Sequence, residues 1–217
     1  MNKQTCPRCG APLDGTPVQA LTPDSPELKQ LFDGTLNRVT CPACQAVVSL
    51  DGGHLAFRDA AKQYILLLMP EPEDGSHEQL ENEVDARMTE EAVEQGIPRP
   101  TLRLVYSRPD FLEKISLHRL GFDDRLVEYA KLQLFRNLEE PQLSRSQHRL
   151  LLDYSGTDDQ KLMFIVYDRE SQRPLHSIQV DMREYLSLEE ELMRSEELQR
   201  ELEAAFPGCY VSADRLL

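Results

Sequence analysis

Two copies of one four-residue pattern, Cys-Pro-x-Cys, constrain the N-terminal part of this chain more than any other feature. They lie at residues 6–9 and 41–44, and residues 10–40 separate them. A short turn between two cysteines supplies two thiolates to a metal, and two such turns complete the tetrahedral set that zinc prefers. The pattern therefore predicts a structural zinc site with no open coordination position, formed by Cys6, Cys9, Cys41 and Cys44.

Paired cysteines can also serve as redox pairs or as disulfides. A redox pair usually opens a helix, whose N-terminus lowers the pKa of the thiol. Here Pro12 and Gly15 follow the first pair and residues 47–50 follow the second, and neither stretch resembles a helix start. Zinc ligation is therefore the favoured interpretation. The fifth cysteine, Cys209, is predicted to be a small, partly buried apolar residue.

The charge balance bears on location and partners. The 217 residues carry a formal net charge of −14, which disfavours binding to nucleic acid through phosphate contacts. Residues 1–10 lack the apolar stretch of a signal peptide, and the longest apolar run, residues 64–69, is too short to span a bilayer. We expect a cytoplasmic protein without membrane contact, where paired cysteines more often bind metal than form disulfides.

Residues 1–60 are predicted to form a zinc-ribbon module. Ser25-Pro26-Glu27 has the features of a helix start, with Ser25 as the N-cap, and Gly34 ends that helix. Residues 46–50 and 54–57 are predicted to be two strands of a ribbon hairpin joined by a turn at residues 51–53.

Residues 61–140 are predicted to form an α/β body. Strands at 64–69 and 101–106 flank an amphipathic, acidic helix within residues 71–95, which predicts a β-α-β unit with parallel strands. Helices at 110–119 and 123–138 follow.

Residues 141–217 are predicted to form a C-terminal β-β-β-α segment, with residues 141–146 as a linker. The expected strands, at 149–154, 161–168 and 175–181, form an antiparallel meander, and one helix covers residues 183–206. The fold class is therefore α+β (mixed α/β). Whether residues 61–217 form one domain or two, and whether they share a sheet, stays open at this stage.

The N-terminal two thirds of the sequence resembles the CpXC family of prokaryotic proteins. The resemblance covers about residues 1–138 and is carried by the paired Cys-Pro-x-Cys motifs, by residues 26–29 and 34–37 between them, and by residues 57–59, 112–115 and 121–128 after them. It implies a zinc-binding module and no established biochemical activity. Gln45 departs from the pattern, since a glycine is expected after the second motif, and this puts the geometry of that turn in question.

Acidic and basic residues at 110–131 are the remaining candidates for chemistry. Asp110 with Glu113 and Lys114, or Glu128 with Lys131, weakly resembles the acid and lysine set of a metal-dependent nuclease. These residues fall on predicted helices rather than on adjoining strands. We interpret the charged residues of this stretch as helix caps and surface ion pairs; they are Asp110, Glu113, Lys114, Arg119, Asp123, Asp124 and Arg125. No catalytic residue is predicted.

The sequence favours a non-catalytic protein-interaction or adaptor module in a bacterial cytoplasm. Ten acidic residues within 71–95 are interpreted first as the solvated face of the helix there, and the alternative is a docking surface for a basic partner. The alternative is a protein that binds or processes nucleic acid through basic residues near the cysteines, namely Lys3, Arg8, Lys29 and Arg38. An enzymatic α/β body would need a deep pocket with perturbed acids. The oligomeric state is not predicted.

Overall fold

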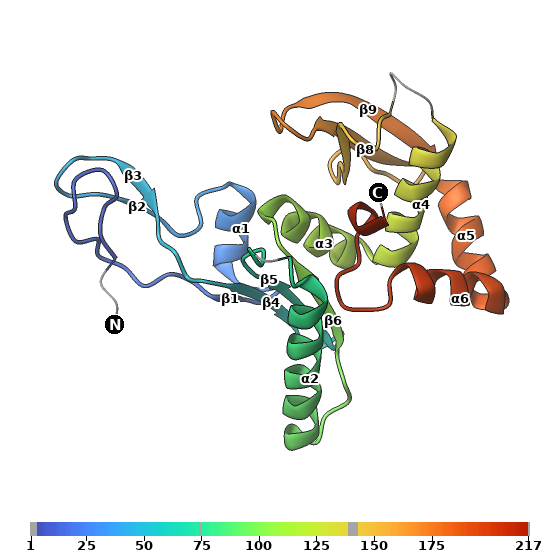
Figure 1. Ribbon diagram of the computed structural model, residues 1–217, viewed down its shortest axis with the longest axis horizontal. Helices are drawn as coiled ribbons and strands as arrows, with labels where there is room; N and C mark the ends of the chain where they lie inside the picture. Colours follow the sequence, from blue (N-terminus) through green and yellow to red (C-terminus); the bar gives the residue numbers. More distant parts are fainter. Residues whose placement is uncertain (1–3, 74, 139–142, 217) are drawn as a thin grey trace. The chain divides into compact units, whose positions relative to one another are not determined.

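The computed structural model shows a mixed α/β chain with three separate sheets, which confirms the predicted fold class (Figure 1). It describes residues 4–73, 75–138 and 143–216. The chain divides into two compact units: the first comprises residues 1–77 and 86–107, and the second comprises residues 78–85 and 108–217. The predicted boundaries at residues 60 and 140 stay predictions. Within the described residues, no helix is both long enough and apolar enough to cross a bilayer.

The ribbon at the start of the first unit is built from one small hairpin and one short helix. Strands β2 (Arg38–Thr40) and β3 (Val47–Ser49) pair antiparallel and carry the second cysteine motif in the loop between them. Helix α1 (Pro26–Phe32) begins with proline in its first turn, as predicted. Ser25 occupies the N-cap position but makes no side-chain cap, because its hydroxyl accepts a hydrogen bond from the backbone N–H of Thr22 at 2.7 Å.

The predicted hairpin between residues 46–50 and 54–57 is wrong. Strand β4 (Leu55–Asp59) pairs with β5 (Tyr64–Leu68) and with β1 (Ala20–Leu21) instead of with β3. Leu55, Ala56 and Phe57 are consecutive and all buried, so both faces of β4 are covered. A strand buried on both faces belongs inside a sheet, whereas a ribbon hairpin would leave one face in water.

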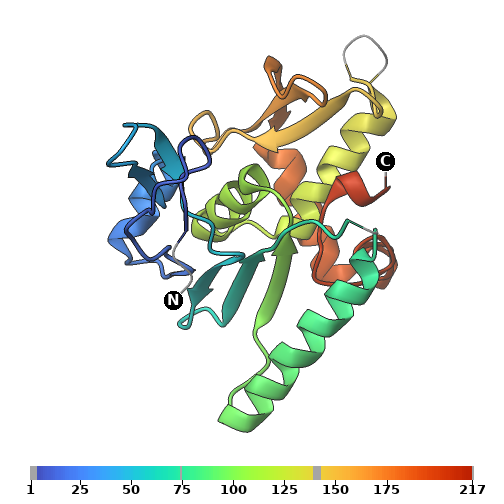
Figure 2. The ribbon, with the colours of Figure 1, turned by 60° about the vertical axis from the view of Figure 1, so that its left-hand side comes forward.

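The sheet of the first unit has the strand order β1-β4-β5-β6 (Figure 2). β6 (Thr101–Val105) pairs parallel with β5 across helix α2 (His77–Gln95), which confirms the β-α-β prediction. The helix begins six residues later than the acidic stretch does, because Pro72 and Gly75 precede it. It ends at Gly96, which adopts a left-handed conformation with φ of 63°.

The second unit packs helices against a three-stranded antiparallel sheet. Helices α3 (Arg108–Leu120) and α4 (Asp124–Asn137) precede strands β7 (His148–Leu152), β8 (Lys161–Asp168) and β9 (Pro174–Asp181), which pair in that order as predicted. One continuous core joins the sheet to the helices. Its fully buried members include Leu117, Leu126, Leu162 and Phe164.

The predicted helix over residues 183–206 is two helices, α5 (Met182–Arg194) and α6 (Glu196–Ala205). Ser195 separates them in an extended conformation, and its hydroxyl accepts a hydrogen bond from the backbone N–H of Leu198 at 3.2 Å. A serine that caps a new helix competes with continuation of the old one. The break lets Leu198 and Leu202 of α6 return to the core.

Two smaller segments complete the second unit. Pro141 and Gln142 of the predicted linker lie outside the described residues, while Leu143 and Ser144 are buried in the unit. After α6 the chain passes Cys209, which is buried as a small apolar residue would be, and ends in the short 3-10 helix η1 (Ala213–Leu216).

Candidate metal centre

The two cysteine motifs fold into the same tight turn. The backbone N–H of Gly10 donates to the carbonyl of Cys6 at 2.8 Å, and that of Gln45 donates to the carbonyl of Cys41 at 2.9 Å. In both turns the N–H of the first cysteine also donates to the carbonyl five residues later, at 2.8 Å. The two motifs are therefore structural repeats, and each presents its two thiols on one side of a loop.

The sequence left open whether Gln45 alters the geometry of the second turn. The backbone conformation of the residue that closes each turn answers this. Gly10 has φ of 72° and Gln45 has φ of 59°, so both occupy the left-handed region. A residue with a side chain pays roughly 1–2 kcal/mol for this conformation. The second turn nevertheless keeps the backbone hydrogen bonds of the first, so the substitution leaves the presentation of Cys41 and Cys44 unchanged.

The four thiols converge on one point. The Sγ atoms of Cys6 and Cys44 lie 3.7 Å apart, those of Cys9 and Cys41 lie 3.6 Å apart, and all four lie within 4.8 Å of one another. Four sulfurs bound tetrahedrally at about 2.3 Å from a zinc ion would be separated by about 3.8 Å. A disulfide requires about 2.05 Å between sulfurs, and the cysteines here are free. The four cysteines could therefore hold one metal ion.

Apolar packing around the thiols is limited. Cys6, Leu13, Cys41 and Leu50 form a separate buried cluster, whereas Cys9 is exposed. A cluster of four buried residues is too small to hold a ribbon together by burial alone. The arrangement fits a fold in which the bonds to a metal replace a hydrophobic core.

The thiols of Cys41 and Cys9 differ in pKa because their surroundings, including local hydrogen bonds, differ. Backbone N–H groups, first that of Cys44 and then that of Ala43, lower the pKa of Cys41 to about 7. For Cys9 the N–H of Ala11 acts in the same direction, but the neighbouring thiols and burial together raise the pKa to about 12. Cys41 therefore becomes a thiolate, which is the form that binds metal, more readily than Cys9 does.

A second cluster of ionisable residues lies inside the second unit. Lys131 on α4 places its Nζ 2.8 Å from Glu113 Oε2 and 2.9 Å from Glu128 Oε1. Lys114 on α3 places its Nζ 3.0 Å from Asp124 Oδ2 and 3.2 Å from Glu128 Oε1. All five side chains are buried, so the interpretation of Glu113, Lys114 and Asp124 as surface ion pairs is wrong. The positions of these residues on predicted helices did not indicate that they are buried. They are buried because both faces of each helix are covered in the folded unit.

The buried network also satisfies backbone groups from distant parts of the unit. Glu113 accepts a hydrogen bond from the N–H of Leu152 in β7, and Glu128 accepts one from the N–H of Ala213 at 2.8 Å. Burial raises the pKa of Glu113, whereas Lys114 and Lys131 outweigh burial at Glu128 and lower its pKa. Glu113 and Glu128 each accept from both ammonium and amide donors, and Asp124 pairs with Lys114, which identifies the network as structural.

The predicted cap is present at the start of α4. The Asp123 side chain accepts a hydrogen bond from the backbone N–H of Arg125 at 2.9 Å, and the two side chains also form an ion pair. Asp110, by contrast, pairs with Arg149 of β7 and ties α3 to the sheet.

The fold and the site define a mixed α/β protein with an N-terminal four-cysteine ribbon. Residues 4–131 match the family described as CpXC protein. Because the match covers more than half of the chain, this protein belongs to the CpXC family, in agreement with the resemblance in its sequence. Neither the curated proteins nor the solved structures include a match to this chain.

The buried network predicts a large effect of removing one charge. Lys131→Met leaves Glu113 and Glu128 without their shared ammonium, and should lower the free energy of unfolding of the second unit by about 3–5 kcal/mol. Arg200→Met, which breaks an exposed pair with Glu196, is the matched control and should cost less than about 0.5 kcal/mol. Chemical denaturation of both variants measures the difference. Equal, small effects would show that the network contributes little.

The thiolate site predicts loss of bound metal in acid. Metal binding requires deprotonated thiols, so affinity is full at high pH and falls as protons compete at low pH. Because the metal itself favours thiolates, the midpoint of release should lie below the pKa of about 7 that Cys41 has without metal. Metal retained by the chain after desalting, measured across a pH series, tests this. Release that grows as the pH rises would contradict thiolate ligation.

Proposed function

We propose that Cys6, Cys9, Cys41 and Cys44 bind one zinc ion and that the ion is structural. The observation that supports this most is the spacing of 3.6 and 3.7 Å between sulfurs from opposite turns, close to the edge of a zinc–thiolate tetrahedron. Four thiolates are soft ligands that suit zinc, and together they leave no position for a substrate or a water. Zinc would link the two turns and thereby order the ribbon.

We further propose that the chain acts as a non-catalytic protein-interaction module. Of the acids that most resembled a catalytic set, Glu113 and Glu128 are enclosed in the buried network and paired with lysines. Asp110 pairs with Arg149 instead. A closed zinc site contributes no reactive position. Both points leave recognition, rather than chemistry, as the role that the described residues support best.

The surface of α2 is the proposed docking site. Met88 and Ala92 are buried, while Glu78, Glu83, Glu90 and Glu94 are exposed. Near the C-terminal end of the helix, Val93 is 74% exposed and Ile97 is 51% exposed, so two aliphatic side chains lie among acidic ones. Such a surface suits a basic partner segment that also carries apolar side chains.

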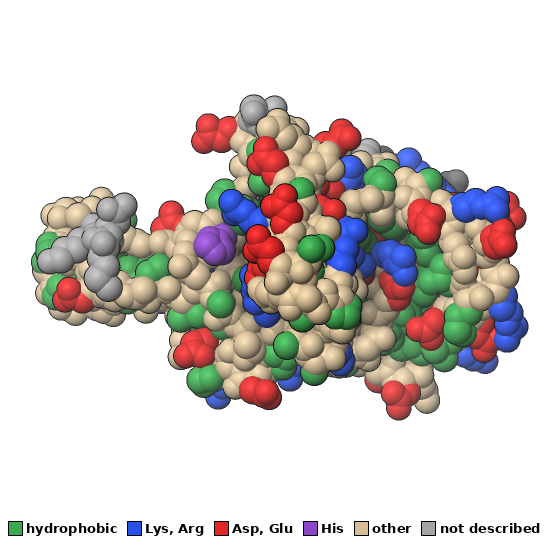
Figure 3. All heavy atoms as spheres, turned by 90° about the horizontal axis from the view of Figure 1, so that it is seen from below, with side chains coloured by type: hydrophobic (Ala, Val, Ile, Leu, Met, Phe, Trp, Pro, Cys, Tyr) green, Lys and Arg blue, Asp and Glu red, His purple; other side chains and the backbone are tan. Residues whose placement is uncertain are grey.

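Nucleic-acid binding remains the alternative function, and the experiments below distinguish it from protein binding. Arg8, Lys29 and Arg38 are exposed in the first unit, and Lys3 lies outside the described residues. On the face shown in Figure 3, lysine and arginine side chains are interspersed with acidic ones. The sequence pI of 4.8 also disfavours contact with phosphates.

The zinc proposal predicts a selective loss of metal and order. Purified chain should contain about one zinc per molecule, and Cys41→Ser should lose the metal because three thiolates no longer close the tetrahedron. The amide signals of the ribbon should then collapse while those of the second unit persist. Cys209→Ser, which changes a cysteine far from the site in sequence, should keep its zinc. A metal-free chain with an ordered ribbon would refute the proposal.

The docking proposal predicts charge-dependent capture of a protein. Replacing Glu90 and Glu94 by lysine reverses the charge beside Val93 and should weaken capture of a specific partner about tenfold or more in a tagged pull-down. Replacing the exposed Glu197 and Glu203 of α6 by lysine makes the same change in net charge and should preserve capture. Equal loss in both variants would indicate general electrostatics. Recovery of nucleic acid that leaves with salt would instead support the alternative.

A further inference from the structure

The two edges of the sheet in the second unit differ in how they are covered. At the β7 edge, the N–H of Leu152 donates to Glu113 of α3, and Arg149 pairs with Asp110 of the same helix. Strand β9 forms the other edge. Proteins usually cover or blunt an exposed strand edge, because its unpaired backbone groups bind other chains. The β7 edge is covered in this way by α3.

The outer edge of β9 directs backbone groups away from the sheet. Residues of β8 and β9 pair as Phe164 with Ile178 and as Ile165 with Ser177, and the N–H of Met182 donates to Gln160 at the end of this ladder. In an antiparallel pair every second residue bonds to its neighbour. Continuing that alternation from Met182 places the N–H and C=O groups of Ser177 and Gln179 on the outer side of β9.

The pairing of β9 with β8 is irregular only near the start of β9, where the register shifts opposite Val166 and Tyr167, and from Ser177 onward the edge lacks the features that block strand pairing. Its only proline is the first residue, Pro174, and it contains no lysine or arginine. Most of the strand is exposed, including Leu175, which is 52% exposed. Among residues 4–73, 75–138 and 143–216, no hydrogen bond reaches Ser177 or Gln179 from beyond the sheet. The edge is therefore open to a further strand.

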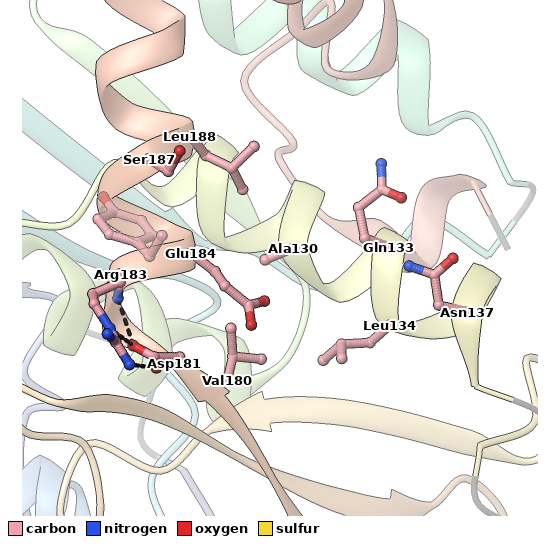
Figure 4. A pocket seen from close by; sticks show the side chains of 11 residues that line it. Ala130, Gln133, Leu134, Asn137, Val180, Asp181, Arg183, Glu184, Ser187 and Leu188 are labelled. Carbon is pink, nitrogen blue, oxygen red and sulfur yellow. Dashed lines mark hydrogen bonds and ion pairs between the residues drawn. The ribbon is translucent and has the colours of Figure 1, made fainter.

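A groove of about 670 Å³ adjoins this edge. It lies between α4 and α5, and β9 also lines it through Val180 and Asp181 (Figure 4). Apolar side chains form much of its wall, namely Ala130, Leu134, Val180, Tyr185 and Leu188. Among the described lining residues, those that come from a strand belong to β9, so the groove adjoins this edge strand. A volume of this size can enclose one or two large side chains.

The charge of the groove comes from Glu184. Arg183 is held by Asp181 at 2.7 Å, which neutralises that pair. Glu184 reaches from α5 into the space between α5 and α4 in Figure 4, and no described residue forms an ion pair or hydrogen bond with it. A carboxylate beside an apolar wall favours an occupant that combines an apolar side chain with a cation.

We propose that the β9 edge binds an extended segment of a partner protein as a fourth strand of this sheet. The backbone of the segment would pair with Ser177 and Gln179. Side chains alternate between the faces of a strand, so every second residue would face the groove. One of these would be a large apolar residue, and a neighbouring one two positions away would be lysine or arginine opposite Glu184. A second copy of this chain fits less well, since each copy would bring Asp181, Glu184 and a net charge of −14.

This surface shares no residue with the α2 surface, and it shares with the proposed function only the role in protein interaction. The probe for its test is the blocked peptide acetyl-Thr-Val-Thr-Leu-Thr-Lys-Thr-Val-amide with a fluorescent label. Fluorescence anisotropy measures its binding to the full chain, and amide hydrogen exchange reports on Ser177 and Gln179. The chain with Glu90 and Glu94 replaced by lysine should bind the peptide like the unmodified chain, so failure at one surface is distinguishable from failure at the other.

Two N-methylated versions of the peptide give the decisive comparison. One carries N-methyl groups on the threonines and the other on the remaining residues, so each version blocks a different edge of the extended peptide. Strand addition uses one edge, so one version should bind about tenfold or more weakly and the other within about threefold of the parent. In parallel, bound peptide should slow exchange at Ser177 and Gln179.

The position of the charge is tested by a matched pair of variants. Glu184→Gln should weaken binding several-fold, whereas Glu203→Gln on α6 changes the net charge equally and should leave binding unchanged. Equal binding of both methylated peptides would overturn strand addition, and so would the absence of binding at millimolar peptide. Concentration-dependent protection of Ser177 and Gln179 without peptide would overturn it in favour of pairing between copies of the chain.

Discussion

The second unit depends on keeping five buried ionisable side chains in a chain of ion pairs and hydrogen bonds. A single buried ammonium or carboxylate is strongly unfavourable, and it is tolerated only when partners replace the water it has lost. Lys131 and Lys114 share Glu128 between them, and the remaining carboxylate oxygen of Glu128 holds the backbone of Ala213. The network therefore fixes the spacing of α3 and α4 and also attaches the end of the chain to them. Apolar packing in the same core is less directional and would not by itself define these positions.

The ribbon of the first unit has a different constraint, because it contains too few apolar side chains to form a hydrophobic core. Its separate cluster contains two leucines and two cysteines, and the turns that present the thiols are held mainly by backbone hydrogen bonds. Repetition of the same turn at Gly10 and Gln45 shows that the backbone geometry, rather than the identity of the closing residue, is what the site requires. The two units thus fix the arrangement of their elements by different interactions. One places charges in its core, and the other brings four sulfurs to one point.

Features with strong local signals could be predicted from the sequence. The convergence of four cysteines follows from two identical turns, and the parallel pairing of β5 with β6 follows from an intervening helix. The choice of partner for β4 could not be predicted, because residues 54–57 are compatible with a hairpin and only the tertiary structure shows that both faces are covered. The buried state of Lys114 and Lys131 was also inaccessible, since a charged residue on a helix carries no sign of what packs over it. Ser195 was the missed signal at the break between α5 and α6, as it is a good N-cap within an otherwise helical stretch.

The assignment of residues 78–85 to the second unit has a consequence for how this chain can be divided. These residues begin α2, whose remaining turns from Ala86 belong to the first unit. Glu81 is buried there and pairs with Arg215 at 2.8 Å, near the opposite end of the sequence. A fragment that stopped at residue 107 would carry Glu81 without this arginine, and a fragment that started at residue 108 would lack the first turns of α2. The two units are interleaved in sequence, so recombination at a single point cannot exchange either one intact, and substitutions in α2 are subject to the packing requirements of both.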